Sequence, residues 1–462
     1  MTATEFSLKI FRILHAGYIF ECDKIKIVFD PIFENPFSQN CYAFPEVKFD
    51  VELIKKLNFS AVFISHFHDD HCSLESLNFI DRHTPIYAYC LHEELFTLIQ
   101  QLGFLYVYPL QLNKSICIGE FEIIPKRALD AEIDSIFHIK AAGLNILNVV
   151  DSWIDDETLA QLAGFTPWDL VLWPFQTLRE VEVLSPSRSV AATGQLPMEW
   201  LEQLTALSPR YVVPSSCQFL QESWSWYNNA LFPITYKQFS IEVKVTLKNT
   251  EVVRLNPGVG IILDKNSLKL TAPLGWIAPI GEQNLDYFYD PNLKPPTTAE
   301  ISRHFAPLSL SQTERVFNFC RLGLLEKFRS LGATSEPYFQ QPRGWQLSVY
   351  DHAGKMISFY YRLNQESIEL VEDCAAPIEW TTEIPIVKLF AAVENGEALT
   401  SLYVRINDIV FAPEIENEIE NKIGSADVFE DPLIRCLFTG VFGAYQIAQL
   451  KKLRQNCSEK LR

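Results

Sequence analysis

The sequence contains no C-x-x-C pair among its ten cysteines, which are scattered along the chain. This absence excludes a zinc ribbon and a Rieske-type cluster, because both need closely spaced cysteine or histidine ligands. The chain also lacks a run of about 18 apolar residues, and no basic segment leads into an apolar one near its start. We therefore expect reduced, mostly buried thiols, no transmembrane segment and a cytoplasmic protein.

No lysine- or arginine-rich run interrupts the acidic composition, and the formal net charge is -18. Such a charge repels a phosphate backbone, so nucleic acid is not an expected partner. We expect a small-molecule substrate instead. Histidine is scarce, at nine residues, so a local cluster of histidines carries information.

A chain of 462 residues exceeds one ordinary hydrophobic core and favours two or three domains. Short apolar bursts rich in β-branched and aromatic residues predict consecutive strands between residues 7 and 30, and the segment SAVFISH predicts a buried strand. Helical spacing returns at 155–164 and 197–207. The pattern predicts an α/β domain over residues 1–285.

Residues 286–300 combine a proline pair with turn-forming and polar residues, which is typical of a linker. Beyond it, an amphipathic helix at 308–331, a hairpin around Asp351 and a closing helix at 432–453 predict a smaller α+β domain over residues 301–462. The acidic run at 414–421 is expected to be a solvated helix face.

The segment SHFHDDH at 65–71 gathers three of the nine histidines directly after an apolar strand. His66 and His68 are separated by one residue, so on an extended segment both imidazoles project to the same side and can hold one ion. Asp70 and His71 follow and can address a neighbouring second ion. The alternative interpretation is a polar surface loop. Three histidines and an aspartate this close together rarely arise from packing alone.

This motif resembles the signature of the metallo-β-lactamase superfamily, which implies an αββα sandwich with one or two divalent metal ions. The upstream segment ILHAGYIFECDKIKIVFDPIF resembles the branch that contains ascorbate-phosphate lactonases, N-acyl-phosphatidylethanolamine phospholipases and CMP-sialic acid hydroxylases. That resemblance implies that His15 lies beside the metal pocket as a catalytic residue. It also implies that Asp30 orients a metal-ligating imidazole from behind. The alternatives are a core histidine and a turn carboxylate.

The later segment FHIKAAGLNILNVVDSW resembles the second metal segment of the same superfamily. By this resemblance His138 completes a three-histidine site with His66 and His68, and Asp151 bridges two ions. A buried histidine without a metal is the alternative for His138.

The chain departs from the pattern at PRYVVPSSCQF, where Ser216 stands at the place of the final histidine of the superfamily. We expect Ser216 to contact the metal-ligating side chains without binding the metal itself. Three interpretations stay open: a single-metal site, a second ion held by Asp70, His71 and Asp151 alone, or recruitment of Cys217 or Glu222. Buried apolar packing is the alternative for the thiol of Cys217.

The resemblance implies a metal-dependent hydrolase that uses a metal-bound hydroxide on an ester, lactone or phosphodiester, with Asp70 orienting the nucleophile. Zinc is the favoured ion, with iron or manganese as alternatives. An iron-dependent oxygenase on the same fold is the second hypothesis, because the C-terminal half resembles the sterol-carrier-like tail of the CMP-sialic acid hydroxylases while their Rieske ligands are absent. A non-catalytic binding protein with a partly lost site is the third. The C-terminal domain is expected to bind an apolar ligand, to cap the site or to mediate a homodimer.

Overall fold

The chain forms two compact units in a computed structural model that describes residues 7–187, 189–334, 336–372, 377–408 and 428–460. Unit 1 comprises the residues up to Leu178, Ala192–Tyr289 and the residues from Gln449 on. Unit 2 comprises Arg179–Ala191 and Asp290–Ala448. The main break after Tyr289 therefore falls inside the segment 286–300.

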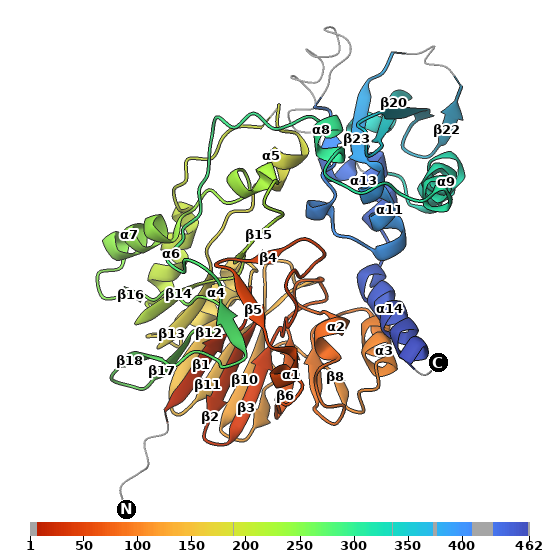
Figure 1. The fold of residues 1–462 in the computed structure, drawn as a ribbon. Helices are drawn as coiled ribbons and strands as arrows, with labels where there is room; N and C mark the ends of the chain where they lie inside the picture. Colours follow the sequence, from red (N-terminus) through yellow and green to blue (C-terminus); the bar gives the residue numbers. More distant parts are fainter. Residues whose placement is uncertain (1–6, 188, 335, 373–376, 409–427, 461–462) are drawn as a thin grey trace, which may run out of the picture. The chain divides into compact units, whose positions relative to one another are not determined.

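Unit 1 is built on two large sheets, one of eight strands and one of seven (Figure 1). The eight-stranded sheet has the order β18 (Leu268–Thr271), β17 (Gly260–Leu263), β1 (Leu8–Arg12), β2 (Tyr18–Cys22), β3 (Ile25–Phe29), β6 (Ala61–Ile64), β7 (Ile86–Ala88) and β8 (Val107–Pro109). The seven-stranded sheet has the order β16 (Glu251–Val252), β14 (Tyr211–Ser215), β13 (Leu170–Pro174), β12 (Leu144–Asn148), β11 (Ser135–Ala141), β10 (Phe121–Arg127) and β9 (Ile116–Ile118).

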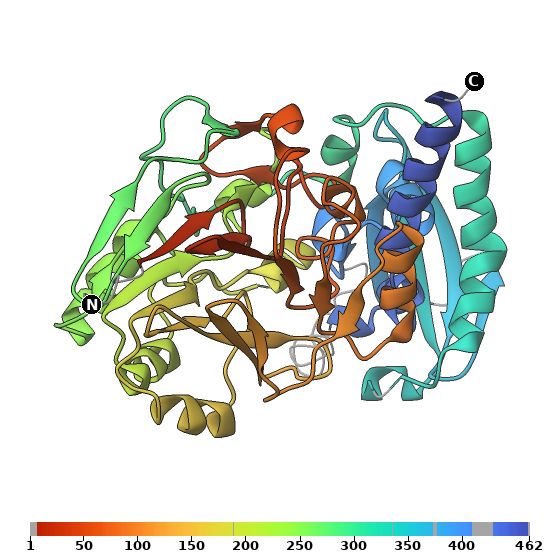
Figure 2. The same ribbon diagram turned by 90° about the horizontal axis from the view of Figure 1, so that it is seen from below.

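The two sheets share one apolar core. Alternate residues of each strand point inward, and Phe29 and Phe63 of one sheet meet Phe137 of the other at ring-centroid distances of 5.0 and 6.3 Å. Helices cover the outer faces, as Figures 1 and 2 show. They are α1 (Val51–Ile54), α2 (Leu74–Leu77) and α3 (Glu93–Gln101) on one side, and α4 (Asp156–Ala163), α6 (Met198–Leu207) and α7 (Tyr236–Thr246) on the other. The expected αββα sandwich is confirmed.

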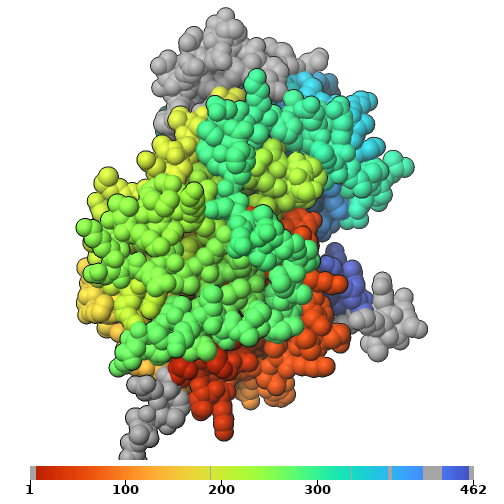
Figure 3. Space-filling model, turned by 60° about the vertical axis from the view of Figure 1, so that its left-hand side comes forward, coloured from red at the N-terminus to blue at the C-terminus, as the bar shows by residue number. Residues whose placement is uncertain are grey.

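Two short ribbons and a 3-10 turn complete unit 1. The ribbons pair β4 (Tyr42–Ala43) with β15 (Phe219–Leu220) and β5 (Val47–Phe49) with β19 (Ile277–Pro279), and the turn is Trp226–Asn229. The segment from α7 to β19, in green, covers much of the face of unit 1 seen in Figure 3.

Unit 2 is an α+β fold around a five-stranded sheet. Its order is β22 (Ile368–Val371), β21 (Met356–Leu363), β20 (Arg343–Tyr350), β23 (Trp380–Pro385) and β24 (Arg405–Ile406). Its helices are α5 (Glu180–Leu184), α8 (Thr298–Ser302), α9 (Leu310–Asn318), α10 (Leu324–Ser330), α11 (Ile386–Asn395) and α13 (Pro432–Phe438), with a π-helical turn at Phe319–Gly323 between α9 and α10. The expected α+β class is confirmed.

The C-terminal end differs from the single closing helix predicted at 432–453. The chain forms α13 and then α14 (Ala444–Lys460), because Gly440 and Gly443 take positive φ angles of 63° and 65° between them. From Gln449 on, α14 belongs to unit 1, where Gln449 binds the backbone N–H of Leu74 at 2.7 Å. Helical spacing alone does not tell which core a helix covers.

Among the described residues, no helix combines the length and apolarity needed to cross a membrane. The acidic run at 414–421 lies outside the described residues, so its helix stays a prediction.

Replacing Phe137 with Ala should lower the free energy of unfolding by about 3–5 kcal/mol, because a cavity opens between the two sheets. The change is measured as a lower calorimetric unfolding temperature. Leu105→Ala is the matched control, since Leu105 is 60% exposed and should change stability by roughly 0.5 kcal/mol or less. Equal effects of both substitutions would contradict this assignment of the core.

Candidate metal centre

Four loops meet at one edge of the sandwich. β1 and β3 run in the same direction, and β6 is parallel to β3, so the residues that follow these strands lie at one edge. His15 follows β1, Asp30 follows β3 and His66 follows β6. All three are buried, with 0–1% of their surface exposed. Asp151 reaches the same place from the loop after β12.

The carboxylate of Asp30 fixes the histidine motif. It accepts hydrogen bonds from the backbone N–H and the hydroxyl of Ser65, both at 2.7 Å, and from His71 Nδ1 at 3.0 Å. This contact holds a proton on Nδ1, so Nε2 is the nitrogen that would bind a metal once a cation displaces its proton. The structure thus places Asp30 where it orients the imidazole of His71.

Four donors converge in front of that imidazole. His71 Nε2 lies 3.2 Å from His15 Nε2 and 2.9 Å from Asp151 Oδ2, and His15 Nε2 lies 3.1 Å from Asp70 Oδ2. One ligand atom from each of His15, Asp70, His71 and Asp151 lies within 4.8 Å of the others. Donors arranged tetrahedrally about 2.0–2.1 Å from an ion are about 3.4 Å apart, so these separations match a shared ion.

His15 reaches this group through the tight turn between β1 and β2. His15 has a φ of 53°, and the turn is closed by hydrogen bonds of 2.8 Å from Ile13 N to Gly17 O and from Gly17 N to Leu14 O. A Cβ on Gly17 would lie 2.8 Å from the carbonyl oxygen of Asp30, so only glycine lets the turn come this close. His15 therefore lies beside the metal-binding motif, and its catalytic role stays a prediction.

Opposite charges compensate one another in this group. Burial alone would lower the pKa of His15 and of His71, but the carboxylates of Asp70 and Asp151 outweigh it and raise both pKa values. Burial alone would raise the pKa of Asp70 and Asp151, but His71 and His15 lower both. The carboxylates thus retain positive charge on the imidazoles, a charge that a divalent cation can replace.

His66, His68 and Asp134 lie beside this group, but among the described residues only the four above bring their ligand atoms within 4.8 Å of one another. The His66 ring is 4.0 Å from the His71 ring and 4.5 Å from the His68 ring, measured between centroids. Asp134 Oδ1 lies 3.8 Å from His66 Nδ1, and its Oδ2 accepts a hydrogen bond from the Ser152 hydroxyl at 2.8 Å. Burial, followed by His71, lowers the pKa of His66 to about 4, so this imidazole is neutral and able to bind a metal. His68 is exposed, which opens this side to solvent.

His138 belongs neither to this group nor to the residues beside it, and this corrects the expected three-histidine site. Its neighbours Phe137 and Ile139 point into the core, so His138 projects from the opposite face of β11. There its ring packs against Phe165 and Trp168 at centroid distances of 4.7 and 4.6 Å, and its Nε2 lies 3.1 Å from Asn145 Oδ1. Burial lowers the pKa of His138 to about 4.

Asp134, and not His138, lies beside His66, and the register of β11 and β12 explains why. Ala141 pairs with Leu144 and Phe137 with Asn148, so continuing this antiparallel register sets Asp134 opposite Asp151. His138 lies four residues further along the strand, about 13 Å away at 3.3 Å per residue. The two-residue turn Ala142-Gly143, with positive φ at both positions, was the sequence signal that identifies Asp134.

The residues near the missing histidine do not join the four-donor group. Ser216 is fully buried with a φ of 57°, and its hydroxyl makes no hydrogen bond. Cys217 is buried, and its carbonyl oxygen accepts a hydrogen bond from Tyr287. Glu222 accepts a hydrogen bond from Asn40 at 3.2 Å. Among the described residues, neither Cys217 nor Glu222 belongs to the four-donor group.

Neither a family model nor a curated protein matches this sequence. Among solved structures, the chain is similar to the metallo hydrolase Igni18 of Ignicoccus hospitalis KIN4/I, with 17% identity, 56% of this chain and 99% of that chain covered, and a TM-score of 0.40. It is similar to the metallo-β-lactamase fold protein YhfI of Bacillus subtilis, with 13% identity, coverages of 56% and 100%, and a TM-score of 0.38. It is also similar to the diiron β-hydroxylase CmlA of Streptomyces venezuelae, with 15% identity, coverages of 57% and 54%, and a TM-score of 0.36.

Likenesses of this degree concern the fold and carry no argument about the reaction. The narrower resemblance to ascorbate-phosphate lactonases and CMP-sialic acid hydroxylases stays a prediction. The function has to be argued from the donors of this chain.

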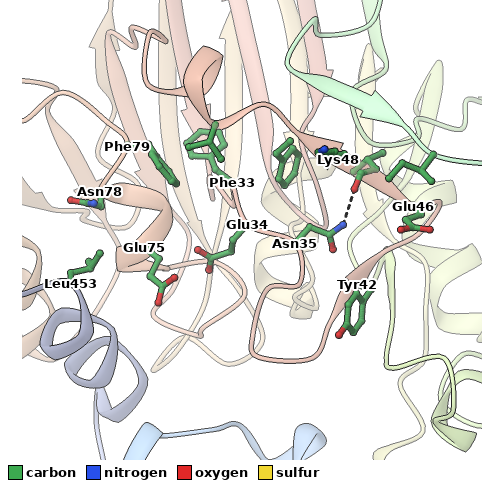
Figure 4. A pocket seen from close by; sticks show the side chains of 14 residues that line it. Phe33, Glu34, Asn35, Tyr42, Glu46, Lys48, Glu75, Asn78, Phe79 and Leu453 are labelled. Atoms are coloured by element: carbon green, nitrogen blue, oxygen red, sulfur yellow. Dashed lines mark hydrogen bonds between the residues drawn. The ribbon is translucent and has the colours of Figure 1, made fainter. Parts of the chain in front are cut away.

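A separate cavity of about 470 Å³ lies between the segment 33–51, α2 and α14 (Figure 4). None of the donors above lines it. Glu34, on its wall, accepts a hydrogen bond from the Ser73 hydroxyl at 2.6 Å, while its Oε2 is buried without a hydrogen bond. Burial raises the pKa of Glu34 to about 7, with Ser73 opposing this shift and Glu75 adding to it.

Replacing His138 with Gln should leave the bound metal unchanged, because His138 lies on the outer face of β11. His71→Ala should lower the metal content, since it removes the imidazole that Asp30 orients. Metal per protein is measured by elemental analysis after dialysis against a metal buffer. Loss of metal from the His138→Gln protein would contradict this prediction and indicate that His138 binds the metal.

Glu34→Gln should flatten the dependence of stability on pH. The raised pKa means that the folded protein binds this proton more tightly than the unfolded chain, so the contribution is present below about pH 4.5 and is lost as the pH rises through about 7. A shift of this size corresponds to roughly 3 kcal/mol. The variant should therefore be more stable than the wild type at pH 8, measured by urea unfolding, and no difference at pH 8 would contradict the assignment.

Proposed function

We propose that the chain is a metal-dependent hydrolase that acts on an ester, lactone or phosphodiester of a small molecule. The observation that carries the proposal is the convergence of His15, Asp70, His71 and Asp151 at separations suited to one ion. A structural histidine cluster would not need two carboxylates aimed at it.

The donor chemistry supports a divalent ion. Imidazole and carboxylate ligands suit zinc, manganese and iron, and the ion pairs of Asp70 and Asp151 within the described chain are with His15 and His71. His15, Asp70, His71 and Asp151 would hold this ion, and the imidazoles of His66 and His68 lie beside it on the side that faces solvent. A bound divalent ion supplies Lewis acidity and lowers the pKa of coordinated water toward about 7.

Other side chains orient the metal ligands or face an incoming substrate. Asp30 keeps the proton of His71 on Nδ1, and Ser152 orients the Asp134 carboxylate. Asp70 and Asp151 are each 23% exposed, so an oxygen of either can contact a substrate or a water that enters from solvent. Asp70 is the residue we assign to orient the attacking water, because it lies next to the exposed His68.

An iron-dependent oxygenase is the second candidate, and one observation favours it. Beside the four-residue group lie two imidazoles and one carboxylate, those of His66, His68 and Asp134, and this is the ligand composition of non-haem iron oxygenases. The same composition also occurs in zinc hydrolases, so it does not displace the first proposal.

Loading the protein with zinc, manganese or iron in turn and testing three substrates distinguishes the candidates. The substrates are p-nitrophenyl acetate, a simple lactone and bis-p-nitrophenyl phosphate. We expect turnover of at least one by the zinc or manganese protein, and a loss of at least about 100-fold in kcat/KM for Asp151→Ala. His138→Gln is the matched control and should retain full activity.

Failure of all three fully loaded proteins on all three substrates would contradict a hydrolase. Iron accumulation with a visible absorption band in the purified protein, together with that failure, would support the oxygenase instead.

A further inference from the structure

Arg12, the last residue of β1, is fully buried three residues before His15. Its guanidinium donates hydrogen bonds to four backbone carbonyl oxygens. These belong to Pro214 at 2.7 Å, His15 at 2.6 Å, Leu255 at 3.3 Å and Ser216 at 3.5 Å. In the described part of the chain no carboxylate pairs with it. Carbonyl dipoles and the face of Tyr18, 5.5 Å away, surround the charge.

A buried guanidinium without a carboxylate is costly, because arginine stays protonated at all working pH values. An apolar side chain of similar size would fill the same space at lower cost. The planar fork of arginine instead offers several donors in fixed directions. The guanidinium of Arg12 therefore acts through its geometry, because its hydrogen bonds connect segments that are far apart in the sequence.

Two of these segments end in strained backbone. His15 has a φ of 53° and Ser216 a φ of 57°, in the left-handed region that non-glycine residues seldom adopt. Their carbonyls accept from the same nitrogen, Nη2 of Arg12. Arg12 thus connects the turn after β1, in the eight-stranded sheet, to the end of β14, in the seven-stranded sheet.

We infer that Arg12 is a positioning residue that sets the His15 imidazole as the fourth donor of the metal group, compensating for the absence of a histidine at 216. The inference rests on the proposed metal site and adds the reason why His15 can occupy it. Through the His15 carbonyl, the guanidinium selects the backbone conformation that directs Nε2 toward His71, 3.2 Å away.

Zinc titration of Arg12→Met and Arg12→Lys tests this. We expect a 10- to 100-fold weaker affinity for the ion held by His15, roughly the loss seen when a group behind a ligand is removed. Arg12→Lys should bind zinc more tightly than Arg12→Met, because the lysine ammonium can still donate to some of the carbonyl oxygens that the guanidinium binds. In the cobalt-substituted protein, the visible absorption band should change in Arg12→Met as it does in His15→Asn.

Arg254→Met is the matched control. The Arg254 guanidinium lies 3.9 Å from the centre of the Tyr236 ring and binds Asn256 at 2.8 Å, but it makes no bond to His15 or Ser216. Its loss should leave zinc affinity unchanged.

A double-mutant cycle with His15→Asn completes the test. If Arg12 acts through His15, Arg12→Lys should weaken zinc binding no further in the His15→Asn protein. Unchanged zinc affinity in folded Arg12→Lys, or additive losses in the cycle, would overturn the inference while leaving the metal site standing. A wild-type protein that binds no ion would instead refute the proposed function itself.

Discussion

The buried carboxylate of Asp30 joins the end of β3 to the loop after β6, and the candidate centre depends on this connection. Its two oxygens are occupied by Ser65 and His71, so the histidine motif is held at one position on the edge of the sheet. The same contact fixes the tautomer of His71 and directs Nε2 toward the other donors. Without the contacts of Asp30, nothing would orient the His71 imidazole toward the other donors.

The donors come from both sheets, which makes the centre a product of the sandwich rather than of one segment. His15, Asp70 and His71 belong to loops of the eight-stranded sheet, while Asp134 and Asp151 belong to the seven-stranded one. Packing of Phe29 and Phe63 against Phe137 keeps the two edges in register. The apolar core and the polar centre are therefore coupled, since any slip of one sheet would separate the carboxylates from the imidazoles.

The centre contains more carboxylates than the three-histidine site that the sequence predicted. Asp134 and Asp151 bring carboxylate oxygens next to the imidazoles of His66 and His71. Hard oxygen donors widen the range of ions that fit, so zinc, manganese and iron all remain suited to the site. This composition is the physical reason why hydrolysis and oxygenation are the two reactions proposed.

By itself, the sequence predicted an α/β domain, a smaller α+β unit and the motif at 65–71, because apolar periodicity and adjacent ligands are local properties of the chain. The αββα arrangement was implied by the resemblance to the metallo-β-lactamase superfamily. What the sequence did not determine was which distant residue completes the set of donors. His138 and Asp134 are only four residues apart, but strand alternation and hairpin register send one outward and the other to the metal edge. His15 reaches the other three donors through a turn that is held by the contacts of Arg12 and Gly17, and these contacts exist only in the folded chain.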